Sequence, residues 1–257
     1  MKKIGLSLLL LSTVVAAMIF AVPLPSYAAP SQEGTTPTPG GSTPLEVVIK
    51  VEDGLEIQGT YYPTEGTEKM PAILLLHQNG GRRQQWDRVV PALIGAGYNV
   101  LAVDQRGFGQ TGGKRDYLLL EKDGVTLMNW LREQPTVDPD RVAVMGASVG
   151  ANAAIRTCVL DQRCLVAIAL SPGVNFFGVK PVEAIKESKG KSYLLLSGQN
   201  DSESAAAVKS ALMETPRSSN ALARLYADKG LHGTDLLMLP DVGPLILNWL
   251  ELYNHKP

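Results

Sequence analysis

Cysteine and histidine are scarce in this sequence, and its charges nearly cancel. Its 257 residues include two cysteines, three histidines, and 24 basic residues against 25 acidic ones. Neither cysteine has a second thiol or a histidine at ligand spacing, which argues against a metal site. A net charge near zero favours neither nucleic acid nor an anionic membrane as a partner. We expect the short basic groups to be solvated surface; they are Arg82-Arg83 and Lys186, Lys189 and Lys191.

The N-terminal segment has the three parts of a secretory signal peptide. Two lysines precede an apolar run from Ile4 to Val22, and small residues follow up to Ala28, after which we expect cleavage. The run is also long enough to be an uncleaved membrane anchor. No cysteine lies near the cleavage site, which argues against a lipoprotein. Residues 29–44 are rich in Pro, Ser, Thr and Gly and predict a flexible linker. Residues 45–257 then form one domain, which we expect to be secreted or periplasmic.

Apolar strand-like runs alternate with amphipathic helical runs through most of this domain, which predicts an α/β fold with helices on both faces of a mostly parallel sheet. The first two strands are joined across Glu52-Asp53-Gly54 and form an antiparallel hairpin at one edge. Eight strands are predicted, at 46–51, 55–62, 72–76, 98–103, 141–145, 165–170, 192–197 and 221–226. Helices are predicted at 84–95, 117–133, 149–159, 203–214 and 235–253.

A G-x-S-x-G pentapeptide lies between a predicted strand and a predicted helix. It reads Gly146-Ala147-Ser148-Val149-Gly150. Flanking glycines permit the tight turn that exposes the serine hydroxyl above the sheet edge, so Ser148 is the candidate nucleophile. The alternative is a serine that only completes a strand-to-helix turn.

A serine nucleophile needs a base, and the usual base is a histidine oriented by a carboxylate. His77 ends a strand ahead of the serine and His255 lies close to the C-terminus, whereas His232 lies in a glycine-flanked loop after the last strand. Asp201 follows the seventh strand, at the edge of the sheet where Ser148 and His232 are also expected. It is alternatively a helix N-cap. The nearest substitute acids are Glu203 and Asp228.

An oxyanion hole needs two backbone N–H donors. Val149 supplies one because it begins a helix directly after the nucleophile. The loop 77–81, which reads His-Gln-Asn-Gly-Gly, supplies the other, and we assign it to Asn79.

These features resemble the α/β-hydrolase superfamily over essentially all of residues 45–257, with serine, acid and histidine in the same order. Residues 98–109, YNVLAVDQRGFG, resemble its fourth-strand signature. Residues 137–142, VDPDRV, resemble the approach to the elbow in its dienelactone-hydrolase-like and peptidase-like branches. The resemblance makes Asp104 and Arg106 structural loop residues. The sequence departs from the superfamily at His77-Gln78, where many members have His-Gly, and its serine differs from the cysteine of dienelactone hydrolases proper.

The function expected from these residues is hydrolysis of small-molecule or lipid-like esters through an acyl-enzyme, without a cofactor. A peptidase or acyltransferase with the same triad is the main alternative, and a non-catalytic binding protein is the other. The segment 171–191 is too short for a large cap, so we expect an open site, with Phe176, Phe177 and Trp86 as candidate lining or core residues. Cys158 and Cys164 are placed to form a short disulfide, or else are two core thiols.

Overall fold

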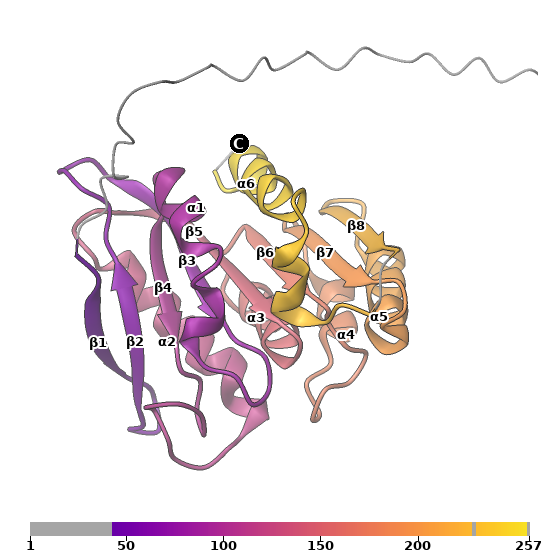
Figure 1. Cartoon of the computed structure of the whole chain (residues 1–257), viewed down its shortest axis with the longest axis horizontal. Helices are drawn as coiled ribbons and strands as arrows, with labels where there is room; N and C mark the ends of the chain where they lie inside the picture. The colour runs from indigo at the N-terminus through magenta and orange to yellow at the C-terminus, as the bar shows by residue number, and fades with distance from the viewer. Residues whose placement is uncertain (1–42, 228–229, 256–257) are drawn as a thin grey trace, which may run out of the picture. The chain divides into compact units, whose positions relative to one another are not determined.

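The structure is a computed structural model that describes residues 43–227 and 230–255. The predicted signal peptide and almost all of the predicted linker lie outside these residues. Within the described ranges, eight strands form one sheet in the order β1-β2-β4-β3-β5-β6-β7-β8 (Figure 1). The strands are β1 Leu45–Lys50, β2 Glu56–Tyr62, β3 Met70–Leu76, β4 Asn99–Val103, β5 Val137–Ala147, β6 Val166–Leu170, β7 Ser192–Gly198 and β8 Asn220–Tyr226.

Strand direction brings the loops of interest to one edge of the sheet. β1 pairs antiparallel with β2, and β2 pairs antiparallel with β4. All other neighbouring pairs, from β4 across to β8, are parallel. The carboxyl ends of the parallel strands therefore share one edge, where open α/β sheets bind their ligands. The predicted fold class, a mostly parallel eight-stranded α/β-hydrolase sheet with an antiparallel hairpin at its edge, is confirmed.

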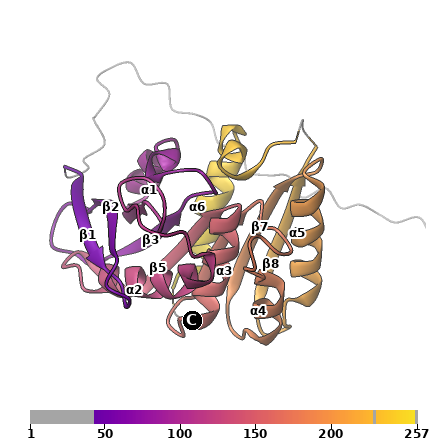
Figure 2. The same cartoon turned by 90° about the horizontal axis from the view of Figure 1, so that it is seen from below.

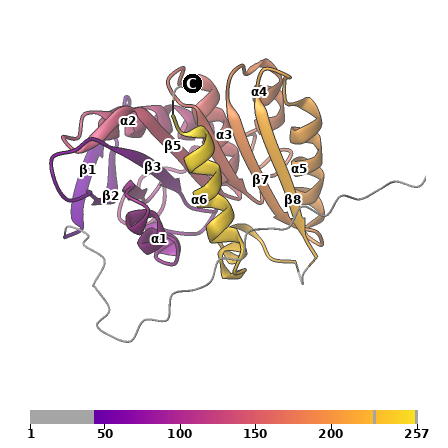
Figure 3. The same ribbon diagram turned by 90° about the horizontal axis from the view of Figure 1, so that it is seen from above.

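Helices cover both faces of the sheet, and alternating residues of β3 divide between the two layers. Leu74 and Leu76 pack in one core with residues of α2, α3 and α5, whereas Ile73 and Leu75 pack in the other with residues of α1 and α6. Figures 2 and 3 show α1 and α6 on one side of the sheet and the remaining α-helices on the other. The helices are α1 Val90–Gly95, α2 Leu120–Arg132, α3 Val149–Leu160, α4 Pro181–Glu187, α5 Ser202–Glu214 and α6 Val242–Tyr253, with short 3-10 turns η1 Arg83–Trp86, η2 Tyr117–Leu119 and η3 Gly233–Met238.

Two of the predicted helices are interrupted where proline limits the backbone. The predicted helix 84–95 divides into η1 and α1, and α1 carries Pro91 at its start. The predicted helix 235–253 divides into η3 and α6, with Pro240 between them. Proline has no N–H to donate to the preceding turn, so a continuous helix cannot run through either position. Leu239, which precedes Pro240, is also extended, as is usual before proline.

The segment 171–191 is described in full and contains no cap domain, as predicted. Its only regular helix, α4, was not predicted; it packs against α3 and α5. The edge of the sheet above Ser148 is therefore left without a helical cover from this segment. Among the described residues, the structure has no helix that is both long and apolar enough to cross a membrane.

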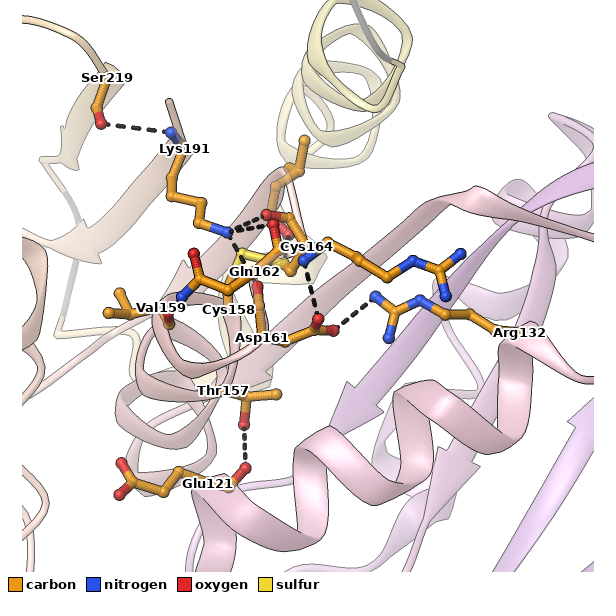
Figure 4. The surroundings of a disulfide bond; sticks show 12 residues. Glu121, Arg132, Thr157, Cys158, Val159, Asp161, Gln162, Cys164, Lys191 and Ser219 are labelled. Atoms are coloured by element: carbon orange, nitrogen blue, oxygen red, sulfur yellow. Dashed lines mark hydrogen bonds and ion pairs between the residues drawn. A yellow bond between two sulfur atoms is a disulfide. The ribbon is translucent and has the colours of Figure 1, made fainter. Parts of the chain in front are cut away.

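A disulfide joins Cys158, near the end of α3, to Cys164, just before β6 (Figure 4). Lys191 reaches the same loop from the start of β7. Its Nζ donates to the carbonyl oxygens of Asp161 at 2.9 Å and Cys164 at 2.5 Å, and burial lowers its pKa. The prediction that Lys191 is solvated was wrong, because its side chain is buried and its ammonium donates to backbone carbonyl oxygens of the loop that follows α3.

Arg83 was also predicted to be solvated and is instead only 4% exposed. It pairs with Asp104 at 2.7 Å and Glu46 at 2.6 Å, which ties η1 to β1 and to the end of β4. Arg106 pairs with Asp123 at 2.5 Å in the same way. Asp104 and Arg106 thus have the structural contacts that the resemblance to the superfamily implied. Each buried charge has a partner, without which burial would be costly.

Candidate active site

Ser148 lies at the sharp turn between β5 and α3. Its φ of 54° and ψ of −122° are backbone angles that residues with side chains rarely adopt. A Cβ on Gly146 would lie 2.0 Å from the carbonyl oxygen of Gly150, and a Cβ on Gly150 would lie 2.3 Å from that of Leu76. Only glycine fits at either position. Strain of this kind, of about 1–3 kcal/mol, is typical of functional sites because the surrounding fold must hold it.

The Asp201 carboxylate has two separate partners. Its Oδ1 accepts the backbone N–H of Ser204 at 3.4 Å, so Asp201 is the N-cap of α5. Its Oδ2 lies 2.6 Å from Nδ1 of His232. The two interpretations made from the sequence, triad acid and helix cap, are therefore compatible. A carboxylate facing Nδ1 holds the proton on that nitrogen and leaves Nε2 available as a base.

Ser148, Asp201 and His232 line one pocket of about 320 Å³ at the carboxyl edge of the sheet. Phe176 and Phe177 line it as well, and the Phe176 ring lies edge-on to His232 at a centroid distance of 6.2 Å. The remaining lining residues are Gln78, Asn79 and Glu203.

The other candidates named from the sequence have different positions. Trp86 is completely buried in the core beside α1 and α6 and does not line the pocket. Glu203 lines the pocket, but the carboxylate that contacts His232 is that of Asp201. Asp228 lies outside the described residues.

A buried histidine shapes the loop after β3. Nε2 of His77 faces the backbone N–H of Gln105 at 3.0 Å, and that group can only donate. Nε2 is therefore the acceptor, and Nδ1 carries the proton and donates to the carbonyl oxygen of Gln78 at 2.7 Å. Burial lowers the pKa of His77, which favours this neutral form.

The same carbonyl of Gln78 also accepts the N–H of Gly81 at 2.9 Å. In a trans peptide the C=O and the N–H point in opposite directions. The N–H of Asn79 is therefore directed away from His77 and Gly81. Val149, the other donor named from the sequence, begins α3, where backbone N–H groups have no partner within the helix.

Two residues at the site were not identified from the sequence. Tyr117 donates its hydroxyl to Oδ1 of Asn79 at 2.8 Å, and its ring stacks on Phe177 at a centroid distance of 4.2 Å. Nothing in the sequence distinguishes it from other residues at the start of a predicted helix. Gln78 extends its side chain to Thr234, in the turn after His232. The only sign of its role in the sequence was that glutamine stands where many members of the superfamily have glycine.

Comparisons with known proteins agree with this architecture. Residues 53–217 match the family model described as X-Pro dipeptidyl-peptidase (S15 family). The uncharacterized protein Rv2307c of Mycobacterium tuberculosis is 35% identical over 138 residues, which are 52% of this chain and 48% of that protein. The putative hydrolase YtaP of Bacillus subtilis is 32% identical over 163 residues, 51% of this chain and 54% of that protein. The chain thus spans about half the length of these curated relatives.

Solved esterases share the fold. Acetyl xylan esterase 1 from Thermoanaerobacterium sp. superposes with a TM-score of 0.70 at 18% identity, over 86% of both chains. The Pyrococcus furiosus esterase Pf2001 superposes with a TM-score of 0.72 at 20% identity, over 88% of this chain and 99% of that one. The predicted membership of the α/β-hydrolase superfamily is confirmed, and the chain belongs to the X-Pro dipeptidyl-peptidase (S15) family of hydrolases.

Proposed function

We propose that this hydrolase cleaves carboxylic esters through a triad of Ser148, Asp201 and His232. One observation carries the proposal: the strained elbow serine shares a pocket with a histidine whose Nδ1 is held by a carboxylate at 2.6 Å. A serine that only completed a turn would need neither a histidine beside it nor a carboxylate behind that histidine.

The proposed chemistry assigns one role to each group of the triad. Nε2 of His232 takes the proton from Oγ of Ser148 as Oγ attacks the acyl carbon. The carbonyl oxygen becomes an oxyanion that accepts hydrogen bonds from the N–H groups of Val149 and Asn79. When the C–O bond breaks, His232 returns the proton to the departing alcohol. Water then attacks the acyl-enzyme, with His232 again as base, which releases the acid and restores Ser148.

The substrates best supported are small esters. The pocket is about 320 Å³, close to the lower end of the range for small-molecule sites, and its aromatic side chains suit an apolar group. The solved esterases that share the fold act on esters, one of them described as an acetyl xylan esterase. Longer lipid-like chains would extend past Phe177, whose side chain is about half exposed, into solvent.

Amide cleavage is the second candidate, and the family match favours it. The S15 family is described by its X-Pro dipeptidyl-peptidase members, and the same triad cleaves amides when the pocket binds a peptide. Comparing kcat/KM for p-nitrophenyl acetate and butyrate with that for Ala-Pro-p-nitroanilide separates the two functions. We expect the esters to be the better substrates, and a strong preference for the dipeptide anilide would assign the protein to the second function.

A fluorophosphonate probe tests the nucleophile. We expect it to label Ser148, and Ser148→Ala to lose labelling and at least about 10³-fold in ester turnover while remaining folded. The matched control is Ser171→Ala, because Ser171 also has a positive φ, of 52°, at the end of a strand but does not line the pocket. Labelling that persists in Ser148→Ala, or equal loss in both variants, would reject the proposed nucleophile.

We also propose that the protein is exported, on the basis of its signal-peptide-like N-terminus and the Cys158–Cys164 disulfide, a bond typical of oxidising compartments. Intact mass of material recovered outside the cytoplasm should correspond to a chain that begins at Ala29. A chain retained in the cytoplasm, or one in the membrane with Met1 still present, would contradict secretion.

A further inference from the structure

Gln78 connects two loops that carry different parts of the candidate site. Its side-chain Oε1 accepts the backbone N–H of Thr234 at 3.1 Å and lies 3.4 Å from the Thr234 hydroxyl. A backbone N–H can only donate, which fixes the amide orientation of Gln78 with oxygen toward Thr234. The two residues are 156 positions apart in the sequence.

Thr234 lies in the first turn of η3, and His232 is the N-cap of that turn. The first N–H groups of a helical turn have no partner within it, so an oxygen from elsewhere is needed to satisfy them. Gln78 provides that oxygen. The backbone that carries His232 is thereby attached to the loop after β3, while the Asp201 carboxylate contacts the histidine ring.

The local backbone is matched to this contact. A Cβ on Gly233 would lie 2.1 Å from Oε1 of Gln78, and Gly233 has a φ of 61°. A side chain at position 233 would therefore displace the amide. The same Cβ position is 3.6 Å from Cβ of Ala147, the residue before Ser148, so the Gln78 amide, the His232 loop and the elbow pack together.

The main chain of Gln78 has a second role. Its carbonyl is held by His77 and Gly81, and this orients the N–H of Asn79. Gln78 thus orients an oxyanion donor through its backbone and fixes the His232 loop through its side chain. A glycine at this position, as in many α/β-hydrolases, would supply only the first of these.

We infer that Gln78 is a positioning residue that couples the oxyanion loop to the loop of His232 in this chain. The inference rests on the proposed function of Ser148 and His232. Gln78 itself exchanges no proton with substrate. Its contribution is the angle and distance at which Nε2 of His232 meets the serine, and a misplacement of about 1 Å at such a site costs on the order of 10²-fold in rate.

The test compares four variants in one assay with p-nitrophenyl acetate. Gln78→Met keeps the length of the side chain and removes the acceptor, and Gln78→Gly restores the common pattern. Gln78→Glu retains an acceptor oxygen for Thr234. Gln84→Met is the control, because Gln84 is an exposed glutamine of η1 that does not line the pocket.

We expect Gln78→Met and Gln78→Gly to lower kcat by roughly 10- to 100-fold with little change in KM. Gln78→Glu should recover most of kcat, and Gln84→Met should equal wild type. We expect the Nδ1–H of His232 to give a sharp low-field proton NMR resonance in wild type and a broadened one in Gln78→Met. A merely structural role would lower the melting temperature without changing kcat per folded molecule or this resonance.

The possible results distinguish a failure of the role of Gln78 from a failure of the proposed triad. Loss of activity in Ser148→Ala together with wild-type kcat in Gln78→Met and Gln78→Gly would overturn the role of Gln78 and leave the triad intact. Wild-type activity in Ser148→Ala would instead overturn the proposed function, and the role of Gln78 with it. Equal losses in Gln78→Met and Gln78→Glu would reject the contact with Thr234 as the cause.

Discussion

Replacing Asp201 by asparagine separates the two contacts of its carboxylate. Asparagine is as good an N-cap as aspartate, so the Oδ1 contact with Ser204 is retained. That contact is long, at 3.4 Å, and even its complete loss in Asp201→Ala should cost only about 0.5–1 kcal/mol of the free energy of unfolding. We therefore expect Asp201→Asn to unfold in urea almost as wild type does.

The effect on catalysis should be far larger. Asparagine removes the charge that stabilises the His232 imidazolium and allows the wrong tautomer of the ring, an effect of around 10⁴ in a well-studied triad protease. A 10⁴-fold loss corresponds to about 5.4 kcal/mol of transition-state stabilisation. The assay is kcat/KM for p-nitrophenyl acetate, measured beside urea unfolding of the same preparations. Asp201→Asn, Glu203→Gln and Asp228→Asn are compared. Near-wild-type turnover in the first variant, with collapse in either of the others, would refute the assignment of Asp201.

Three further predictions concern stability. Gly150→Ala should lower the free energy of unfolding by about 3 kcal/mol, because its Cβ would lie 2.3 Å from a backbone carbonyl oxygen. The control Gly243→Ala, in an open helical position, should be neutral or stabilising. Equal urea midpoints for the two variants would contradict this prediction. Burial lowers the pKa of His77, so the unfolded chain binds that proton more readily. The contribution of neutral His77 to the free energy of unfolding should be fully present above the unfolded-state pKa of about 6.5 and should decline as the pH falls below that value. In urea unfolding at several pH values, the free energy of unfolding of His77→Asn should depend less on pH than that of wild type. Replacing Cys158 and Cys164 by alanine opens a short loop and should lower the free energy of unfolding by about 2 kcal/mol. Equal urea midpoints for the variant and wild type under non-reducing conditions would argue against the bond.

The fold could be predicted almost entirely from local patterns. Strand positions followed from short apolar runs, and the hairpin followed from Glu52-Asp53-Gly54, where Gly54 has the positive φ that a turn requires. The order of the strands within the sheet was not predicted and comes from the structure. The elements missed were short ones: α4 is a helix of seven residues in a proline- and glycine-rich segment, where the helical period is too brief to detect.

The candidate site could be predicted only as far as it depends on strand ends. Ser148, Asp201 and His232 all follow parallel strands, so their common edge was readable from the sequence. Contacts between side chains that are distant in the sequence could not be predicted. Two such contacts join Gln78 to Thr234 and Tyr117 to Asn79. Each depends on where two loops meet in space, which the periodicity of the sequence does not indicate. Arg83 and Lys191 were misjudged for the same reason, because their buried partners are remote in the sequence.

The elbow is positioned by contact between backbones. Gly150 packs directly on the carbonyl of Leu76, and Gly146 on that of Gly150, so neither contact involves a side chain. Sequence drift in the surrounding core can therefore change side-chain volumes without moving the serine, provided that both glycines and the strand spacing remain. Such tolerance fits a fold shared with esterases at only 18–20% identity. In a library of variants screened for folding, positions 146 and 150 should be the least replaceable of the elbow, and the apolar face of α3 should accept substitutions that conserve volume.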